Sequence, residues 1–419
     1  MPDTEIKAPS PDTGKARSIP GPSEMVVMVA GLMAVNALAI DIMLPALNQI
    51  AHAVGLTAAG VESDNRQQLI IFAYVLGFGA PQILWGPVTD RFGRRGPLFV
   101  SLIGYVITAT LCIAVRDFHA LLIARFVQGV FSAGVRLVAT SVVRDLFAGR
   151  QMARFMSLVM TIFMIIPIIA PAVGQTILLV APWEWIFGVL VMFGLTMLVW
   201  TWLRLPETLA PENRSPLNLG TALGAYAEVI RTPITFGYMC ASGIVFGALF
   251  SFIATSEQVF REVFHRGEDF VLWFSGIAGM LALANFTNSR LVEAVGMRRI
   301  SHVALILFTT LSALSAILTT LFGENLFRFY PMFILTFACF GLMGSNFSAL
   351  AMEPLGKIAG TAAAAYGFAT TTVASLIGML IGSQYNGTTV PLMMGFVGLG
   401  LSSLVIILIT EKGRLFSSR

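Results

Sequence analysis

Charged residues are scarce in this sequence. Only 11% of its 419 residues are charged and 56% are hydrophobic, whereas a soluble domain carries about 25% charged residues. Water is therefore not the solvent for most of this chain. Cysteine and histidine are scarce too: the three cysteines and four histidines lie in separate segments, without the spacing of a disulfide framework, a metal site or a nucleophile–base pair. We expect no metal and no cofactor, and we do not expect an enzyme.

Long apolar runs dominate the chain. Twelve runs approach the length of about 20 residues that crosses a bilayer. Their approximate bounds are 25–46, 67–86, 97–115, 119–142, 155–180, 185–204, 234–255, 270–288, 300–321, 328–350, 361–384 and 390–410. The pattern predicts an all-α integral membrane protein with twelve transmembrane helices. Such a protein contacts the lipid bilayer and is complete as a monomer.

Lysine and arginine are distributed unevenly along the chain. Most of the 26 lysines and arginines lie in segments that would share one side of the membrane with the N-terminus. The positive-inside rule places that side in the cytoplasm, so both termini are predicted to be cytoplasmic. The formal charge of +4 reflects this bias. No basic stripe with interleaved aromatic residues indicates a nucleic-acid partner.

One loop between two apolar runs concentrates charge. Residues 86–96 read G-P-V-T-D-R-F-G-R-R-G, with one acid and three arginines. Asp90 can pair with a neighbouring arginine near a helix end, and Gly93 permits a tight turn. Arg94 and Arg95 hold that turn at the cytoplasmic face. The residues that define the pattern are Gly86, Asp90, Arg91, Gly93, Arg94 and Arg95.

A hydrophilic interruption divides the spans into six and six. The second half carries a degenerate copy of the charged loop, N-S-R-L-V-E-A-V-G-M-R-R at 288–299. Repeats of this kind build two pseudo-symmetric six-helix halves that face each other across a central cavity. The predicted organisation is a disordered cytoplasmic tail (1–24), an N-terminal half (25–204), a central cytoplasmic loop (205–233), a C-terminal half (234–410) and a cytoplasmic tail (411–419).

Asp41 is the only acid that the apolar pattern places well inside a span. Burial and a neighbouring arginine act in opposite directions on the protonation of a carboxyl group, so Asp41 can be poised to exchange a proton. The alternative is an acid that caps the end of the first helix. Arg125 lies at a comparable depth in the fourth span, where a pair with Asp41 is geometrically allowed. Arg136 lies about 20° from the same helix face and roughly 16 Å further inward; backbone carbonyls could instead satisfy both arginines.

The fifth span contains a cluster of small residues and prolines. Pro167 and Pro171 remove two backbone donors from one helix face, and Gly174 lets a neighbouring helix approach closely. This pattern predicts a kink. The kink is either passive or a pivot on which the two halves rock.

Together these motifs resemble the bicyclomycin-resistance type of drug/proton antiporter, within the major facilitator superfamily. The resemblance rests on D-I-M-L-P-A-L at 41–47, the loop at 86–95, R-F-V-Q-G at 125–129, R-D at 144–145, the segment 167–174, A-S-G at 241–243, N-S-R at 288–290 and A-G-T at 359–361. It spans the chain from the first predicted helix to the last. It implies the major facilitator fold, export of small molecules in exchange for protons, and a location in the bacterial inner membrane.

The resemblance also implies roles for single residues. Asp41 matches the proton-linked acid of the first helix and Arg125 the arginine of the fourth, while the charged loop matches a conformational latch. The sequence departs from the pattern at Met33, near the place where some relatives carry a second acid. It departs again at Arg136, where a small or neutral residue is expected. Arg136 favours either a negatively charged substrate or a second partner for Asp41, and one carboxyl suggests one proton per cycle.

The substrate pocket is less clearly indicated. Phenylalanine and methionine can build an adaptable apolar surface. The candidate lining residues are Met33, Asn36, Tyr74, Phe163, Phe246, Phe250, Asn346 and Tyr366. Broad export of amphipathic drugs fits this set, and so does narrow export of a metabolite or organic anion. A proton-coupled importer of the same fold is the remaining alternative.

Overall fold

The computed structural model describes residues 20–56, 65–147, 149–214 and 219–416. Within these ranges the chain is helical and forms no strand. The N-terminal half comprises α1 (Pro22–Asp41), α2 (Leu47–Ala53), α3 (Leu69–Gly79), α4 (Gln82–Phe92), α5 (Arg95–Ala114), α6 (Phe118–Leu146), α7 (Gly149–Phe163), α8 (Ile166–Val180) and α9 (Glu184–Arg204). After α10 (Leu219–Arg231), the C-terminal half comprises α11 (Pro233–Gln258), α12 (Phe270–Val295), α13 (Met297–Phe322), α14 (Leu326–Met352), α15 (Ala359–Phe368), α16 (Ala374–Gly382) and α17 (Val390–Thr410).

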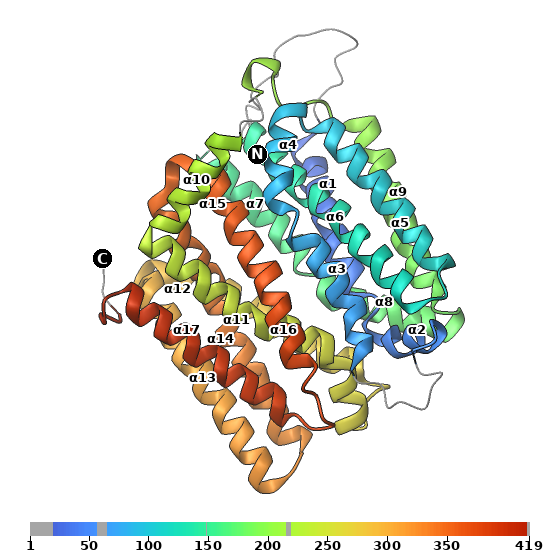
Figure 1. Ribbon diagram of the computed structural model, residues 1–419, viewed down its shortest axis with the longest axis vertical. Helices are drawn as coiled ribbons and strands as arrows, with labels where there is room; N and C mark the ends of the chain where they lie inside the picture. The colour runs from blue at the N-terminus through green and yellow to red at the C-terminus, as the bar shows by residue number, and fades with distance from the viewer. Residues whose placement is uncertain (1–19, 57–64, 148, 215–218, 417–419) are drawn as a thin grey trace.

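These helices form two bundles of six spans that lie side by side (Figure 1). Eleven helical segments among the described residues are long and apolar enough to cross a membrane. Helices α3 and α4, which are bent by 42° at their junction, pass the same test as one further span. The prediction of twelve membrane helices is therefore confirmed.

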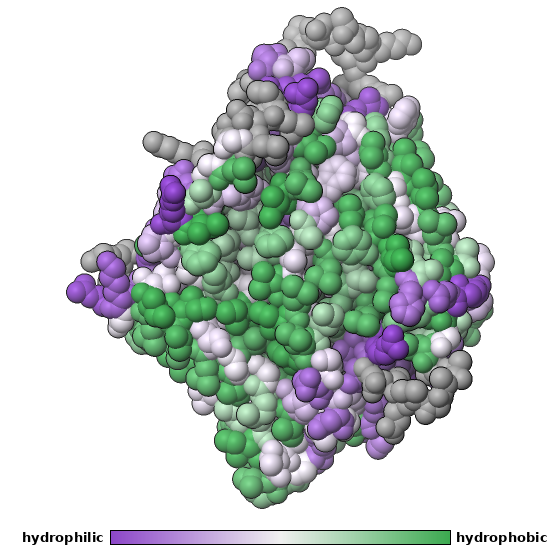
Figure 2. All heavy atoms as spheres, viewed as in Figure 1, coloured by the Kyte–Doolittle hydropathy of each residue, from purple (hydrophilic) through white to green (hydrophobic). Residues whose placement is uncertain are grey.

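The outer surface of the bundle is apolar. Figure 2 shows hydrophobic side chains across the middle of the visible face and hydrophilic ones gathered toward its ends. Large apolar residues such as Ile123 and Leu272 are exposed, as expected where lipid replaces water. We call the end that carries Asp90, Arg94, Arg204 and Arg298 the basic face, and the end that carries Arg66, Arg116, Arg261 and Arg266 the opposite face.

Several spans are interrupted, and the interruptions lie where the two halves meet. The first span stops at Asp41 and continues through a 3-10 turn (Leu44–Ala46) into α2, because Pro45 has no amide hydrogen to extend the helix. The fifth span breaks between α7 and α8, and Pro167 lies in the first turn of α8. The predicted kink is thus present as a break just before Pro167. In the eleventh span, a π-helical turn (Ala369–Val373) joins α15 to α16.

The connecting segments differ from the sequence-based expectation in two places. The first helix begins at Pro22, inside the predicted tail, of which residues 1–19 lie outside the described residues. The central segment contains α10, whose 13 residues are too few for a membrane span and which the search for apolar runs therefore did not predict. Tyr226 of α10 packs with a small cluster that includes Val229, Leu355 and Ala362, so α10 lies against the C-terminal half.

Candidate functional site

Arg125 lies at the centre of the N-terminal half and is fully buried. Its guanidinium donates to the Ala39 carbonyl at 2.9 Å, to Gln128 Oε1 at 2.7 Å and to the Ile70 carbonyl at 3.4 Å. The same group stacks on the Tyr74 ring, 4.3 Å from its centroid. The Ala39 carbonyl belongs to the last turn of α1, where helical donors run out. Arg125 therefore ties α6 to the ends of α1 and α3 through backbone carbonyls.

Asp41 is buried, and no described residue pairs with its carboxyl group. Its residue is only 5% exposed, and within the described part of the chain it accepts no hydrogen bond and joins no ion pair. The pair between Asp41 and Arg125 that the sequence allowed is not formed, because the guanidinium is occupied by carbonyls of α1 and α3, which was the stated alternative for this arginine. A carboxyl buried in this way is far less costly when it carries its proton. This unpartnered acid is the chemically distinctive group of the N-terminal half.

Helix α8 packs closely on the break beside Asp41. A Cβ atom added at Gly174 would overlap the carbonyl oxygen of Ile42 and contact the Pro45 ring. Ala170 and Pro171 of the same helix are buried. The glycine thus allows the fifth span to rest directly on the irregular backbone that carries Asp41.

We expect Gly174→Ala to destabilise the protein by about 1–3 kcal/mol, because the added methyl group meets a backbone atom that cannot rotate away. Thermal unfolding in detergent measures the effect. Gly279→Ala is the matched control, since an added Cβ there meets no atom within 4 Å. Equal unfolding temperatures for the two variants would contradict this account of the packing.

Polar side chains join the two halves at the opposite face. We call Asn48, Asn65, Gln68, Glu257 and Gln258 the interhalf cluster. Asn48 donates to Glu257 Oε2 at 3.1 Å, and Gln68 donates to Gln258 Oε1 at 2.7 Å and to the Gly382 carbonyl at 3.3 Å. Gln258 in turn donates to Asn65 Oδ1 at 3.1 Å. These bonds hold α2 and the start of the second span against α11 and α16.

The contacts between halves are distributed unevenly across the membrane. Among the described residues, every hydrogen bond that directly links the six-span halves involves either the interhalf cluster or Ser275, which donates to the Ile168 carbonyl at 3.2 Å. Toward the basic face, α4 lies against α15, and Tyr226 of α10 donates to the Ile83 carbonyl at 3.4 Å. The direct hydrogen bonds between the halves are therefore concentrated toward the opposite face.

Glu257 is a buried acid that the sequence pattern missed. It lies in the last turn of α11, is 6% exposed, and pairs with Arg261 at 3.2 Å as well as with Asn48. The predicted span ends at about 255, which leaves Glu257 outside it. The helix continues past that point, first as α11 and then as a π-helical turn (Val259–Val263). The available signal was the absence of proline and glycine between 255 and Gly267, since nothing in that stretch ends a helix.

We expect Glu257→Gln to increase the population in which the opposite face is open, because a neutral amide accepts a weaker hydrogen bond from Asn48 than a carboxylate does. If this hydrogen bond stabilises the closed form by about 1 kcal/mol less, the equilibrium between closed and open forms of the opposite face shifts roughly fivefold toward the open form. Spin labels at His119→Cys and Glu268→Cys report the distance between halves. Glu262→Gln is the control, since Glu262 bonds only within its own half. Identical distance distributions for the two glutamine variants would contradict the prediction.

The charged loop folds around Arg94 at the basic face. Arg94 is 2% exposed, and its guanidinium bonds Asp90 and Asp145, each at 2.7 Å. Glu207 accepts from the Arg94 and Arg95 amides at 2.8 and 3.1 Å. Burial alone would lower the pKa of Arg94, but the bonds to Asp145 and Asp90 outweigh it and raise that pKa above its ordinary value. The predicted pairing of Asp90 with a neighbouring arginine is present.

The other loop residues have separate positions. Gly93 has φ +84°, and a side chain there would also meet the Glu207 carboxylate. Arg95 donates to the Trp202 carbonyl at 3.0 Å and stacks on Phe99. Arg91 is exposed and lies over the Phe92 ring. Only one of the three arginines is therefore at the centre of the network.

The degenerate copy of this loop builds a related network in the C-terminal half. Arg298 bonds Glu411 at 2.8 Å and lies 3.9 Å from Glu353. Partial burial would raise the pKa of Glu411, but hydrogen bonds from Arg298 and Tyr238 lower it below its usual value. His302 lies 3.0 Å from the Tyr238 hydroxyl and accepts from a backbone amide of the C-terminal segment. At the basic face, both halves thus place an arginine between an acid at the end of the fourth span and an acid just after the sixth.

The predicted pocket residues have diverse surroundings. Tyr74 donates to Ser132 at 2.7 Å, and Asn346 donates to Asn288 at 2.7 Å, so both are committed to bonds within their own halves. Tyr366 donates to Ser242 at 3.0 Å. Met33 and Asn36 are buried, whereas Phe163, Phe246, Phe250 and Tyr366 are half-buried. Their role in binding substrate stays a prediction.

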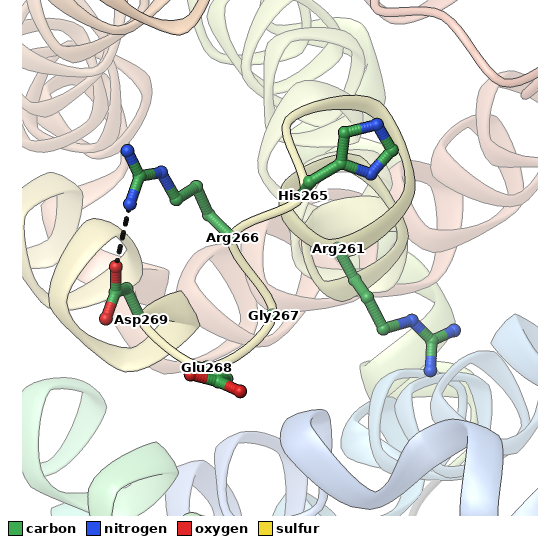
Figure 3. A pocket seen from close by; sticks show the side chains of 6 residues that line it. All are labelled: Arg261, His265, Arg266, Gly267, Glu268 and Asp269. Atoms are coloured by element: carbon green, nitrogen blue, oxygen red, sulfur yellow. Dashed lines mark hydrogen bonds and ion pairs between the residues drawn. The ribbon is translucent and has the colours of Figure 1, made fainter.

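A hollow of about 440 Å³ lies elsewhere, at the opposite face. It is lined by Arg261, His265, Arg266, Gly267, Glu268 and Asp269. Figure 3 shows Arg266 reaching toward Asp269, its ion-pair partner at 3.3 Å, while Arg261 points away from that pair. No predicted site residue lies in this hollow. Among the described residues, no group of three or more His, Cys, Asp or Glu could hold a metal ion.

Comparison with known proteins places this arrangement in a family. The sequence profile of the Major Facilitator Superfamily matches residues 29–383. The chain belongs to that superfamily. It is 30% identical over 358 residues to the bicyclomycin resistance protein homolog of Haemophilus influenzae, covering 84% of this chain and 87% of that protein.

Two further comparisons agree with this assignment. The multidrug resistance protein MdtL of Salmonella heidelberg is 27% identical over 284 residues, covering 66% of this chain and 71% of the relative. A crystal structure of a D-xylose-proton symporter has the same fold, with a TM-score of 0.71 at 14% identity over 92% of this chain and 96% of the symporter. The resemblance to drug-efflux transporters is confirmed, and the superfamily member described here is a transporter rather than an enzyme.

Proposed function

We propose that this transporter exports small molecules across the bacterial inner membrane in exchange for protons, by alternating access. The observation that carries the proposal is Asp41, a membrane-embedded acid without a partner in the described structure, located in the break of the first span. Seven positions further along the same segment, Asn48 enters the interhalf cluster. A proton site and a contact between the halves therefore share one irregular stretch of backbone.

The distribution of positive charge orients the cycle. We assign the basic face, with both termini, to the cytoplasm. The interhalf cluster then closes the periplasmic end, which corresponds to a state facing the cytoplasm. In this state Asp41 carries its proton, and substrate entering from the cytoplasm favours release of that proton.

Return of the transporter completes the exchange. The interhalf cluster separates, substrate leaves to the periplasm, and Asp41 takes up a proton there. Arg125 holds the Ala39 carbonyl throughout, which keeps the last turn of α1 fixed while the carboxyl exchanges its proton. Coupling requires only that proton and substrate stabilise different states by a few kcal/mol.

Transport in everted membrane vesicles tests the direction and the coupling. We expect vesicles containing the transporter to accumulate a phenicol, a fluoroquinolone or a small organic anion when their interior is acidified. A protonophore should abolish the accumulation. Uptake into right-side-out vesicles driven by external acid would identify an importer instead, and uptake that ignores the proton gradient would contradict the proposal.

A further inference from the structure

Arg136 lies on the interior side of α6, although its side chain is exposed. It is about 20° around the helix axis from Arg125, which is fully buried, and about 140° from Ile123, which is 66% exposed on the lipid-facing side. Its guanidinium lies over the Phe78 ring of α3, 5.5 Å from the centroid. The exposed side chain of Arg136 therefore faces the space between the helices rather than lipid.

No acid of the described residues compensates this cation. Arg136 joins no ion pair, and its side chain donates no hydrogen bond. The helices packed against α6 are α1, α3, α4, α5 and α7, and α3, α5 and α7 contain no acid. In the remaining helices, including α6 itself, Glu24 pairs with Arg204, while Asp90 and Asp145 pair with Arg94.

Asp41 is too far away to serve as the missing partner. It lies at the level of Arg125, since Arg125 binds the carbonyl of Ala39 two residues before it. Arg136 is roughly 16 Å further along α6 toward the basic face. The alternative of a second partner for Asp41 therefore does not hold in this state.

We propose that Arg136 is the anion-recognising residue of the transport cavity, and that the substrates are amphipathic organic anions with a carboxylate group. A guanidinium binds a carboxylate through two parallel hydrogen bonds and is costly to leave unpaired at this depth. The Phe78 ring beneath it is buried and supports the guanidinium through a cation–π contact, which leaves the nitrogen atoms of Arg136 available to a ligand. The inference rests on the proposed function, because it names the class of molecule that the exporter carries.

Binding of a matched probe pair tests the role of Arg136. The probes are naphthalene-2-carboxylate and naphthalene-2-carboxamide, which differ in charge but hardly in shape, measured by equilibrium dialysis against the full chain in detergent. We expect the wild type to prefer the carboxylate by about tenfold. Arg136→Gln should remove the preference without weakening the amide, and Arg136→Lys should restore part of it.

Matched controls separate a direct role from a general loss of structure. Arg154→Gln removes a positive charge from α7 at an exposed position and should leave both affinities unchanged. Size-exclusion profiles show whether each variant is folded. The proposal is overturned if the wild type shows no preference for the carboxylate, or if Arg136→Gln and Arg154→Gln lower carboxylate affinity equally.

Proton release measured in the same samples distinguishes this inference from the proposed function. If binding of either probe releases a proton from the wild type but the carboxylate is not preferred, the exporter remains and Arg136 has no anion-recognising role. If the carboxylate is preferred through Arg136 and no proton is released, the anion site remains and proton coupling fails.

Discussion

Asp41→Asn is expected to reduce proton-driven transport to the level of protein-free liposomes while leaving the protein folded. Asparagine has nearly the same shape as a protonated aspartic acid but cannot release a proton. Because Asp41 has no hydrogen-bond partner in the described structure, the substitution breaks no observed contact. Substrate-induced proton release from purified protein, followed with a pH indicator, measures the effect directly.

The energetic consequence for the cycle is large. Each proton that moves inward contributes about 2.3 kcal/mol per 100 mV of membrane potential, in addition to the pH gradient. A transporter without an exchangeable proton loses that entire driving force. It should still bind substrate, and it should exchange labelled for unlabelled substrate across the membrane.

The control for this experiment is another neutralised acid. Glu268→Gln changes an exposed residue in a loop at the opposite face and should leave proton release intact. Proton release that persists in Asp41→Asn would mean that another group carries the proton. Glu257 is then the first alternative proton carrier, because it is the other acid that is buried within a membrane span of the described residues.

Composition and motif order were sufficient to predict the fold. Apolar runs of membrane length gave the twelve spans, and the charged loop predicted the bond between Asp90 and a neighbouring arginine. Both features depend on local sequence. A span needs only a continuous apolar stretch, and Asp90 and Arg94 are one helical turn apart.

The details of the site depended on where helices end, which periodicity does not reveal. Helical geometry placed Asp41 and Arg125 at comparable depth, but α1 stops at Asp41, and its freed Ala39 carbonyl takes the guanidinium. Glu257 was missed for the same reason, since α11 extends beyond its apolar run. The partners of Arg94 from distant segments, Asp145 and Glu207, required the tertiary structure.

The two networks at the basic face have equivalent positions in the two halves. Each half binds an arginine of its second loop to an acid at the end of its sixth span or just beyond it, through Arg94 with Glu207 and Arg298 with Glu411. The N-terminal network is the more buried of the two around its arginine. These contacts lie within each half or between a half and the segment that follows it, so the proposed rocking of the halves would leave them intact.

Arg94→Ala is expected to destabilise the N-terminal half by about 3 kcal/mol, the lower end of the range for breaking a buried ion pair. The lower end applies because the Asp90 side chain is 45% exposed and can be rehydrated, whereas the Asp145 side chain, at 12%, cannot be hydrated as easily. Thermal unfolding in detergent should show a midpoint several degrees lower, with a parallel loss of transport.

The neighbouring arginine provides the matched control within the same loop. Arg91→Ala removes the same charge from an exposed position, and such substitutions change stability by about 0.5 kcal/mol or less. Arg94→Lys retains the charge but loses the fork that bonds two acids at once, so its unfolding midpoint should lie between those of the wild type and Arg94→Ala. If Arg94→Ala and Arg91→Ala unfold together, the buried network does not stabilise this half, and the loop acts only through its overall positive charge.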